Sequence, residues 1–388
     1  MRFNHNYGSV FLGSLLLFIC VFDPKDLLLG IKIPLFISFV VVVLVGKILK
    51  KEKLCIPIDL LLFLILFSIF IPLFSSFVYY IRNDFQFSGY QGLSFIKAYV
   101  FLFFAVFLYF IDNKLLPIFI RLLLLLSIIT ISLFFVTYIF PEYIDAIYKF
   151  GDKYGIFAMP RRQYGSLSFL AIYFHTAPLL IFSLGYYLYE YFQTRKVINL
   201  ICFAITFLSL LFSGTRNNVF SAILMSIVFY FVFLRNKTNR QIIMIMALVS
   251  VVLFMPSIIE LINSSPVSDK TKLNFAMEYI EIMRNPTTSL IGQGFGSSFF
   301  TSERGVVSLT ELTYFEIFRR FGIIFGVLQI FLMFYPLFYW RTQSADKRWI
   351  IIVYIFYLIM VFFNPFYFSS NGMIILSFVL VSKYKFWS

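Results

Sequence analysis

Arginines in the short polar connections between long apolar runs have the clearest capacity for chemistry in this sequence. Arg216 lies in the turn SGTRNN, residues 213–218, and the adjacent Arg161 and Arg162 lie in the earlier segment MPRRQYG. A guanidinium group keeps its charge and binds phosphate oxygens through a planar fork of donors. These arginines therefore predict a binding site for an anion that carries phosphate.

The turn around Arg216 has further features of an anion site. Gly214 suits a tight turn, and Ser213 or Thr215 suits the N-cap of the apolar helix that follows. Free N–H groups at the start of that helix would then lie beside the guanidinium. The alternative is that Arg216 only reaches lipid head groups and caps the preceding helix. The arginine pair at 161–162, in another connection, favours the anion site.

More basic residues follow in a long connection and in the helix after it, namely Lys270, Lys272, Arg284, Arg304, Arg319 and Arg320. We expect Lys270, Arg319 and Arg320 to contribute to substrate binding. The same helix begins with four side chains spaced to share one face, which are Glu311, Tyr314, Phe315 and Phe318. Glu311 is a candidate general base and Tyr314 a candidate substrate contact. The alternative is that Glu311 and Glu316 only stabilise the positive end of the helix.

His175 and a glycine-rich segment are weaker candidates. His175 falls within a predicted membrane span, where an ionisable side chain suggests a substrate contact. The segment GQGFG, 292–296, is interpreted as a tight turn, with a backbone anion nest as the alternative. The histidines are only two, His5 and His175, and few acids are grouped near either. We therefore expect no metal site and no other cofactor.

Membrane-spanning helices are the elements that must position these residues. Of the 388 residues, 61% are apolar and 13% charged, whereas a soluble domain is roughly 25% charged. Apolar runs of about 18 residues favour helices over the ~10-residue strands of a membrane barrel. Hydropathy predicts about twelve spans, near 9–22, 31–47, 57–80, 96–111, 119–140, 168–189, 197–212, 217–234, 241–261, 313–340, 349–363 and 371–382.

The distribution of charge predicts the orientation of these spans. If the N-terminus is cytoplasmic, the even-numbered connections are rich in Lys and Arg and poor in acids, as the positive-inside rule requires. The fold class is then an all-α polytopic membrane protein, one domain over 1–388, with both termini cytoplasmic. Its long periplasmic connections are 141–167 and 262–312, and the second contains a short helix that starts near Ser268. The net charge of +14 is mainly a topology signal, so no nucleic-acid partner is needed.

Four features in this order resemble the O-antigen polymerase and O-antigen ligase superfamily of bacterial envelopes. They are Arg162 to Gly165 before a span, the SGTR turn, a long loop with a short helix and GQGFG, and a Tyr/Glu helix that runs into RRFGIIFG. The likeness covers roughly 155–326. It implies a GT-C-like membrane glycosyltransferase of the bacterial inner membrane, with a periplasmic site and a glycan on undecaprenyl pyrophosphate as donor. A chain-length regulator is a further partner that the resemblance suggests.

One residue separates the two branches of this superfamily. Ligase-like members typically carry a His-Asn pair where the helix after the long loop begins, and Glu311 stands at that histidine position. The departure favours the polymerase, which transfers the growing chain to another lipid-linked repeat unit. In that reading Arg161, Arg162 and Arg216 stabilise the leaving pyrophosphate, and Glu311 accepts the proton of the acceptor hydroxyl.

Two alternatives remain open. One is an O-antigen ligase, which transfers the glycan to lipid A–core. The other is a transporter, for example a flippase for lipid-linked oligosaccharides, because many spans and intramembrane arginines also suit transport. Long charged connections on one face only, and the lack of an internal repeat, argue against the transporter.

Overall fold

The computed structural model describes residues 5–82, 96–111, 114–164, 167–233, 266–341, 345–362 and 364–385. The first helices are α1 (His5–Phe22) and α2 (Lys32–Leu49). A 25-residue rod follows, Ile58–Arg82, made of α3 (Ile58–Leu64), the π-helical η1 (Ile65–Phe70) and α4 (Ile71–Arg82). The predicted span 241–261 lies outside the described residues.

The middle of the chain alternates long helices with short irregular segments. It contains η2 (Phe101–Phe103), α6 (Phe104–Phe110), α7 (Leu115–Ile139), η3 (Pro141–Tyr143), α8 (Ile144–Tyr154), η4 (Ala177–Leu179), α9 (Leu180–Thr194), α10 (Val197–Phe212) and α11 (Arg216–Phe233). The C-terminal part contains α13 (Pro266–Met283), α14 (Pro286–Ile291), α15 (Thr313–Phe334), η5 (Tyr335–Arg341), α16 (Ala345–Phe362), η6 (Pro365–Phe368) and α17 (Ser370–Val381).

Five helical stretches in the described residues are long and apolar enough to cross a membrane, namely Lys32–Leu49, Ile58–Arg82, Leu115–Ile139, Arg216–Phe233 and Thr313–Trp340. Shorter apolar helices cover Tyr7–Phe22, Ile96–Phe110, Val197–Phe212 and Ser370–Val381. Isoleucine, leucine and phenylalanine dominate their exposed faces, as lipid contact requires. The expectation of a helical membrane protein is therefore confirmed.

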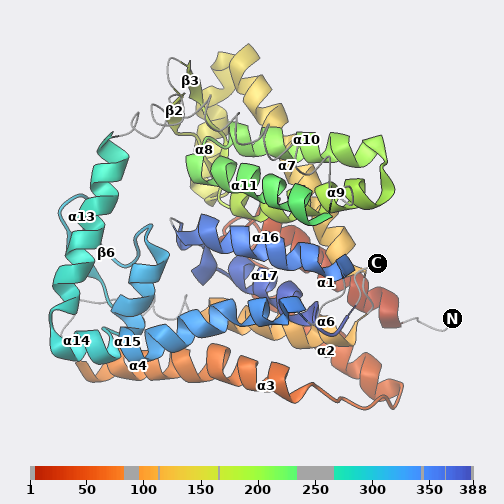
Figure 1. The fold of residues 1–388 in the computed structure, drawn as a ribbon, viewed down its shortest axis with the longest axis horizontal. Coiled ribbons are helices and arrows are strands. Elements are labelled where there is room, and N and C mark those ends of the chain that lie inside the picture. The colour runs from red at the N-terminus through yellow and green to blue at the C-terminus, as the bar shows by residue number, and fades with distance from the viewer. Residues whose placement is uncertain are drawn as a thin grey trace.

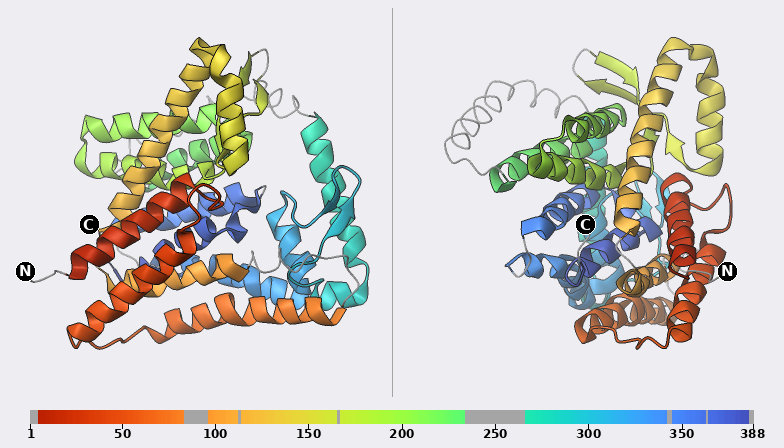
Figure 2. Two further views of the ribbon diagram at one scale, coloured as in Figure 1. Left: turned by 180° about the vertical axis from the view of Figure 1, so that it is seen from behind. Right: turned by 90° about the vertical axis from the view of Figure 1, so that its right-hand side faces the viewer.

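The two ends of the molecule differ in structure. Both termini lie at one end, on the right in Figure 1, whereas α13, α14 and β6 lie at the other. There α13 runs across the ends of the long helices rather than along them (Figure 1). Helix α8 folds back along α7 (Figure 2). Helix α17 is buried along its whole length from Asn371 to Val381, so it forms the centre of the packed core.

Three small antiparallel ladders occur in the long connections. They pair β1 (Phe157–Ala158) with β4 (Tyr173–Phe174), β2 (Arg161–Tyr164) with β3 (Leu167–Leu170), and β5 (Phe299–Thr301) with β6 (Gly305–Val307). Strands β3 and β4, together with η4, occupy residues that the hydropathy pattern had assigned to the span 168–189. That helix begins only at Leu180, because backbone pairing in β3 and β4 replaces helical hydrogen bonds before it.

The helix predicted in the second long connection is α13. It ends at Met283, close to the predicted stop at MRNP, because Pro286 three residues further on disfavours a helical conformation at Asn285. It starts at Pro266, two residues before Ser268, where the start was predicted. Proline at a first helical position is favourable because its missing N–H would have no partner there.

Candidate functional site

The turn SGTRNN joins α10 to α11, with Gly214 in the turn as predicted, while the Ser213 hydroxyl donates to the Leu210 carbonyl at 2.6 Å. Gly214 adopts φ +67°, a left-handed conformation that favours glycine. The Thr215 carbonyl accepts the N–H of Asn218 at 3.1 Å and of Val219 at 3.2 Å. Arg216 is therefore the first residue of α11, and it is half-buried beside the N–H groups of the first helical turn.

Arg162 packs directly against this turn. A Cβ atom added at Gly214 would lie 2.7 Å from Arg162 Cγ and 2.5 Å from Ala171 Cβ, so only glycine fits under the arginine. The Ile172 N–H donates to the Phe212 carbonyl at 3.1 Å and fixes the approach. The buried Arg162 Nε has no hydrogen-bond partner among the residues that the structure describes. The structure thus brings together two basic segments that the sequence only predicted to meet.

Tyr173 and Asn364 extend this contact to the C-terminal helices. The Asn364 side-chain amide donates to the Tyr173 hydroxyl at 2.5 Å, and the Thr313 hydroxyl donates to the Asn364 carbonyl at 2.9 Å. The pKa of Tyr173 is raised to about 12, mainly by burial. The Glu311 charge also raises this pKa, while the Asn364 hydrogen bond and the Arg162 charge lower it. The hydroxyl is therefore protonated at neutral pH, and both charges are close enough to act on it.

Glu311 precedes α15 instead of lying on its first turn. The backbone of Leu312 is not helical, at φ −96° and ψ 81°, and α15 starts at Thr313. Glu311 therefore does not share a helix face with Tyr314, Phe315 and Phe318, and that prediction is wrong. The Glu311 carboxylate accepts from Arg304 Nη2 at 2.8 Å and is 38% exposed, so it is oriented by a cation and open to solvent.

We name this region the polar junction, defined by Arg162, Tyr173, Gly214, Glu311 and Asn364. The SGTRNN turn is also tied to α16, since the Asn217 side-chain amide donates to the Met360 carbonyl at 2.8 Å. The junction thus joins four segments that are distant in sequence. It combines an arginine without a full set of partners, a helix start, a protonated phenol and an exposed carboxylate.

Arg319 and Arg320 do not open onto this junction, which corrects the expectation that they bind substrate. Both are buried, at 0% and 1% exposure, around the fully buried Glu316. Glu316 Oε1 accepts from Arg319 Nη2 at 2.5 Å and Arg320 Nε at 2.8 Å, while Oε2 accepts from Arg319 Nε at 2.9 Å and the Tyr279 hydroxyl at 2.6 Å. We call Tyr279, Glu316, Arg319 and Arg320 the buried carboxylate cluster. Its charged groups bind one another inside the protein and are not exposed to a substrate.

The glycine-rich segment GQGFG packs against the cluster, which supports the tight turn over the anion nest. The N–H groups of Gln293 and Gly294 donate to the carbonyls of Arg319 and Arg320 at 2.7 and 3.0 Å. Those carbonyls are available because α15 is broken at Gly322, which adopts φ +68° and ψ −176°. A Cβ at Gly322 would lie 2.3 Å from the Leu290 carbonyl oxygen, so this close backbone contact requires glycine.

The other predicted site residues are His175, Arg161, Lys270 and Tyr314. His175 follows β4 outside any helix, with its ring 6.0 Å from that of Tyr173. Burial, and then the Lys25 charge, lower the pKa of His175 to about 4, so the imidazole is neutral. Arg161 is exposed on the strand that carries Arg162, Lys270 is exposed in α13, and the Tyr314 ring packs on Phe362 at 5.0 Å.

Tyr173 and Asn364 were missed by the sequence reasoning. Tyr173 is one of 25 tyrosines, and nothing in its local sequence distinguishes it. Asn364 had a usable signal, because the dipeptide Asn-Pro interrupts two apolar runs at FFNPF. Its side chain caps η6 by accepting the Phe366 N–H at 3.2 Å.

Comparison of the chain with protein-family models, curated proteins and solved structures finds no match. The described residues also contain no group of three His, Cys, Asp or Glu side chains that would hold a metal ion. The chemistry of the polar junction therefore follows from its own groups. They can bind a multiply charged anion through arginine and N–H donors, and they can accept a proton at Glu311.

Proposed function

We propose that the chain is a membrane glycosyltransferase of the O-antigen polymerase type. It would transfer a growing glycan from undecaprenyl pyrophosphate to another lipid-linked repeat unit at the periplasmic face of the bacterial inner membrane. The observation that carries this proposal is the contact of Arg162 with Gly214, two residues before Arg216. That contact places the side chain of Arg162, whose buried Nε has no partner among the described residues, beside the start of α11, a combination suited to pyrophosphate.

In this mechanism the bond between the anomeric carbon and the pyrophosphate oxygen breaks, and its electron pair stays on the leaving group. Arg162 and Arg216 stabilise the added negative charge, more strongly than in water because the surroundings are apolar. The acceptor hydroxyl oxygen forms the new bond to the anomeric carbon, and its proton passes to the Glu311 carboxylate. Arg304 keeps Glu311 oriented, and its 2.8 Å ion pair is compatible with a solvent-accessible base.

The proposed topology has about twelve spans, both termini in the cytoplasm and the long connections in the periplasm. Its support is the arrangement in Figure 1, in which the termini lie at one end and the second long connection at the other. A chain-length regulator protein would then meet the same periplasmic end.

Alanine variants at Arg216 and Arg162 test the proposal in cells. Each should abolish the polysaccharide ladder while the protein still inserts at a normal level. Arg121→Ala, which removes an exposed arginine of α7, is the matched control and should leave the ladder intact. A wild-type ladder from Arg216→Ala at normal expression would refute the role of the turn.

Reaction of the purified protein separates the proposal from its rivals. Lipid-linked repeat units mixed with the protein in detergent should yield longer lipid-linked chains, because a polymerase needs no second compartment. A flippase would give no new covalent product in that mixture. A ligase would consume lipid A–core when it is added, and would not lengthen chains without it.

A further inference from the structure

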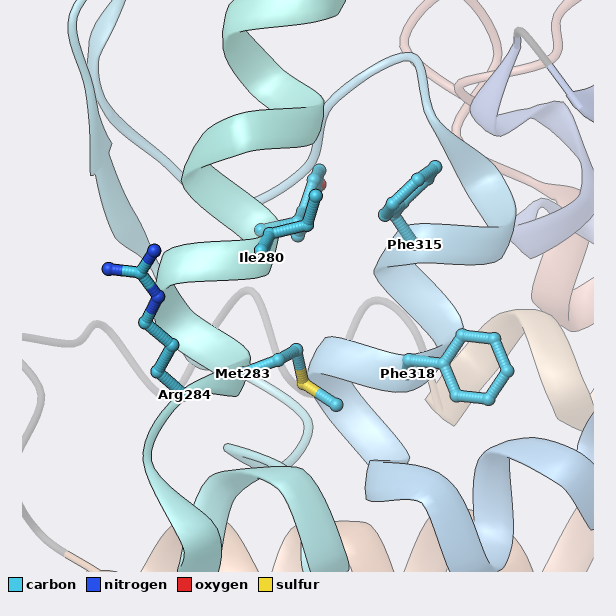
Figure 3. Close-up of a pocket in the computed structure, with 6 residues that line it drawn as sticks. Ile280, Met283, Arg284, Phe315 and Phe318 are labelled. Atoms are coloured by element: carbon cyan, nitrogen blue, oxygen red, sulfur yellow. The ribbon is translucent and has the colours of Figure 1, made fainter.

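An apolar groove lies between α13 and α15, and the hydroxyl of its lining residue Tyr279 is hydrogen-bonded to that of Thr310, the neighbour of Glu311. Its volume is about 390 Å³, and its lining residues are Tyr279, Ile280, Met283, Arg284, Phe315 and Phe318. In Figure 3, Met283 of α13 extends toward α15, whereas Arg284 points away from the gap. We call this space the α13–α15 groove.

The polar groups around the groove already have partners. The Tyr279 hydroxyl donates to Glu316 Oε2 at 2.6 Å and is hydrogen-bonded to the Thr310 hydroxyl at 2.6 Å. The Arg284 guanidinium forms an exposed ion pair with Glu281 at 2.6 Å. A sugar or a peptide in the groove would leave its own polar groups without hydrogen bonds, at a cost of a few kcal/mol each. The lining therefore selects an apolar occupant.

The groove is continuous with surfaces suited to lipid. On α13, the exposed residues Leu273, Met277 and Ile280 are spaced to form one stripe, and they are 63%, 63% and 50% exposed. On the other side, α15 belongs to a stretch long and apolar enough to cross a membrane. Helix α13 runs across the ends of these long helices (Figure 1), so its exposed apolar stripe lies beside the end of α15.

The groove also begins at the reacting end of the proposed substrate. Phe315 lies in the first turn of α15, which starts two residues after Glu311. A chain attached to a pyrophosphate at the polar junction can therefore enter the groove at Phe315 and continue past Phe318 and Met283. A pocket of this volume is at the lower end of the ~300–1,000 Å³ typical of ligand sites, so it holds one segment of a long chain.

We propose that the α13–α15 groove binds the part of a polyprenyl chain that is next to the diphosphate of the lipid-linked substrate. This inference rests on the proposed function, since it takes the diphosphate to lie at the polar junction. Three aromatic rings and the flexible Met283 provide a wall that adapts to a branched, unsaturated chain. The remainder of the chain would stay in the bilayer.

A photoreactive undecaprenyl phosphate that carries a diazirine on its first isoprene units tests the proposal. The purified protein is reconstituted in nanodiscs of phosphatidylethanolamine and phosphatidylglycerol, irradiated, and digested for mass spectrometry. We expect label on the segments that contain Met283 and Phe315–Phe318. Excess unlabelled undecaprenyl phosphate should remove most of this label, and additional phosphatidylglycerol should not.

Two variants and one control make the test specific. Met283→Trp fills the groove, and Ile280→Arg adds a charge at a half-exposed lining position that tolerates polarity; each should lower the label at least five-fold. The control Met277→Trp also replaces a methionine of α13 by tryptophan, but outside the groove, and should leave the label unchanged. Equal melting temperatures of the three proteins would exclude unfolding as the cause.

The outcomes are distinguishable from those for the proposed function. Label on other segments, no label, or competition by phosphatidylglycerol would each overturn the groove assignment, even if the ladder still depends on Arg216. Specific label without chain growth in detergent would keep the polyprenyl site and refute the polymerase. A label that persists in both groove variants would also overturn the assignment.

Discussion

Replacing Glu316 by glutamine removes the negative charge that lies between two buried guanidinium groups. In the native protein the carboxylate accepts four hydrogen bonds, two from Arg319, one from Arg320 and one from Tyr279, at 2.5 to 2.9 Å. Glutamine keeps the shape of the side chain, but its amide nitrogen would donate toward groups that are themselves donors. The variant therefore leaves buried positive charge uncompensated with little change in volume.

The expected cost follows from the burial of the whole cluster. Breaking a buried ion pair by removing one partner costs about 3–5 kcal/mol, because the remaining charge cannot be solvated. At about 1.4 kcal/mol for each factor of ten, the unfolding equilibrium shifts by roughly 100- to 4,000-fold. We expect the melting temperature to fall by about 4–6 °C, since an unfolding entropy of about 2.1 cal/mol/K per residue makes each kcal/mol correspond to roughly 1.2 °C in a chain of 388 residues.

Heating in detergent followed by fluorescence-detected size exclusion measures this change. Unfolding of a membrane protein is commonly irreversible, so apparent melting temperatures are compared at one heating rate. Glu281→Gln is the matched control: it makes the same change in an ion pair with Arg284 whose side chains are 66% and 72% exposed. Such a pair contributes about 0–1 kcal/mol, so the control should melt within about 2 °C of the native protein. Native-like melting of Glu316→Gln would refute the reasoning.

Three further predictions concern backbone, hydrogen bonding and protonation. Gly322→Ala should prevent accumulation of folded protein, because its Cβ would lie 2.3 Å from a backbone oxygen, whereas Gly305→Ala, at a similar φ in open space, should accumulate; quantitative immunoblotting compares them. Tyr173→Phe leaves the Asn364 amide without its acceptor, at about 1–3 kcal/mol, so both the ladder and the melting temperature should fall. His175 titrates at about 4 when folded and near 6.5 when unfolded, so stability is full above pH 6.5 and falls toward pH 4; melting curves of His175→Phe should lack this slope.

Local patterns in the sequence predicted the elements, and some of the site, correctly. Apolar runs located the long helices, and α15 falls within the predicted span 313–340. The glycine and the short polar residues of SGTRNN predicted a turn with Gly214 at its centre, and Gly214 has the left-handed φ that this requires. These inferences succeed because they depend only on the conformational preferences and hydropathy of neighbouring residues.

The functions assigned to charged residues were less predictable, because they depend on segments far away in sequence. Arg319 and Arg320 looked like outward-facing cations, yet Gln293, Ser297 and Ser308 from the preceding loop supply acceptors that bury them. Tyr173 and Asn364 are separated by 191 residues, and no local spacing relates them. Hydropathy also assigned residues 168–179 to a span, because short paired strands of apolar residues have the same composition as a helix start.

The buried carboxylate cluster and the polar junction are connected through the irregular segment that carries Glu311. The carbonyl of Ser308 accepts from Arg319 Nη2 at 3.1 Å and from Arg320 Nη2 at 2.7 Å. The Thr310 hydroxyl is hydrogen-bonded to the Tyr279 hydroxyl at 2.6 Å. Residues on the N-terminal side of Glu311 are therefore fixed to the cluster. On the other side, Thr313 is bonded to Asn364. An exposed carboxylate on an otherwise irregular segment is thereby held at both ends by buried groups, which is how a flexible loop can present a proton acceptor at a defined position.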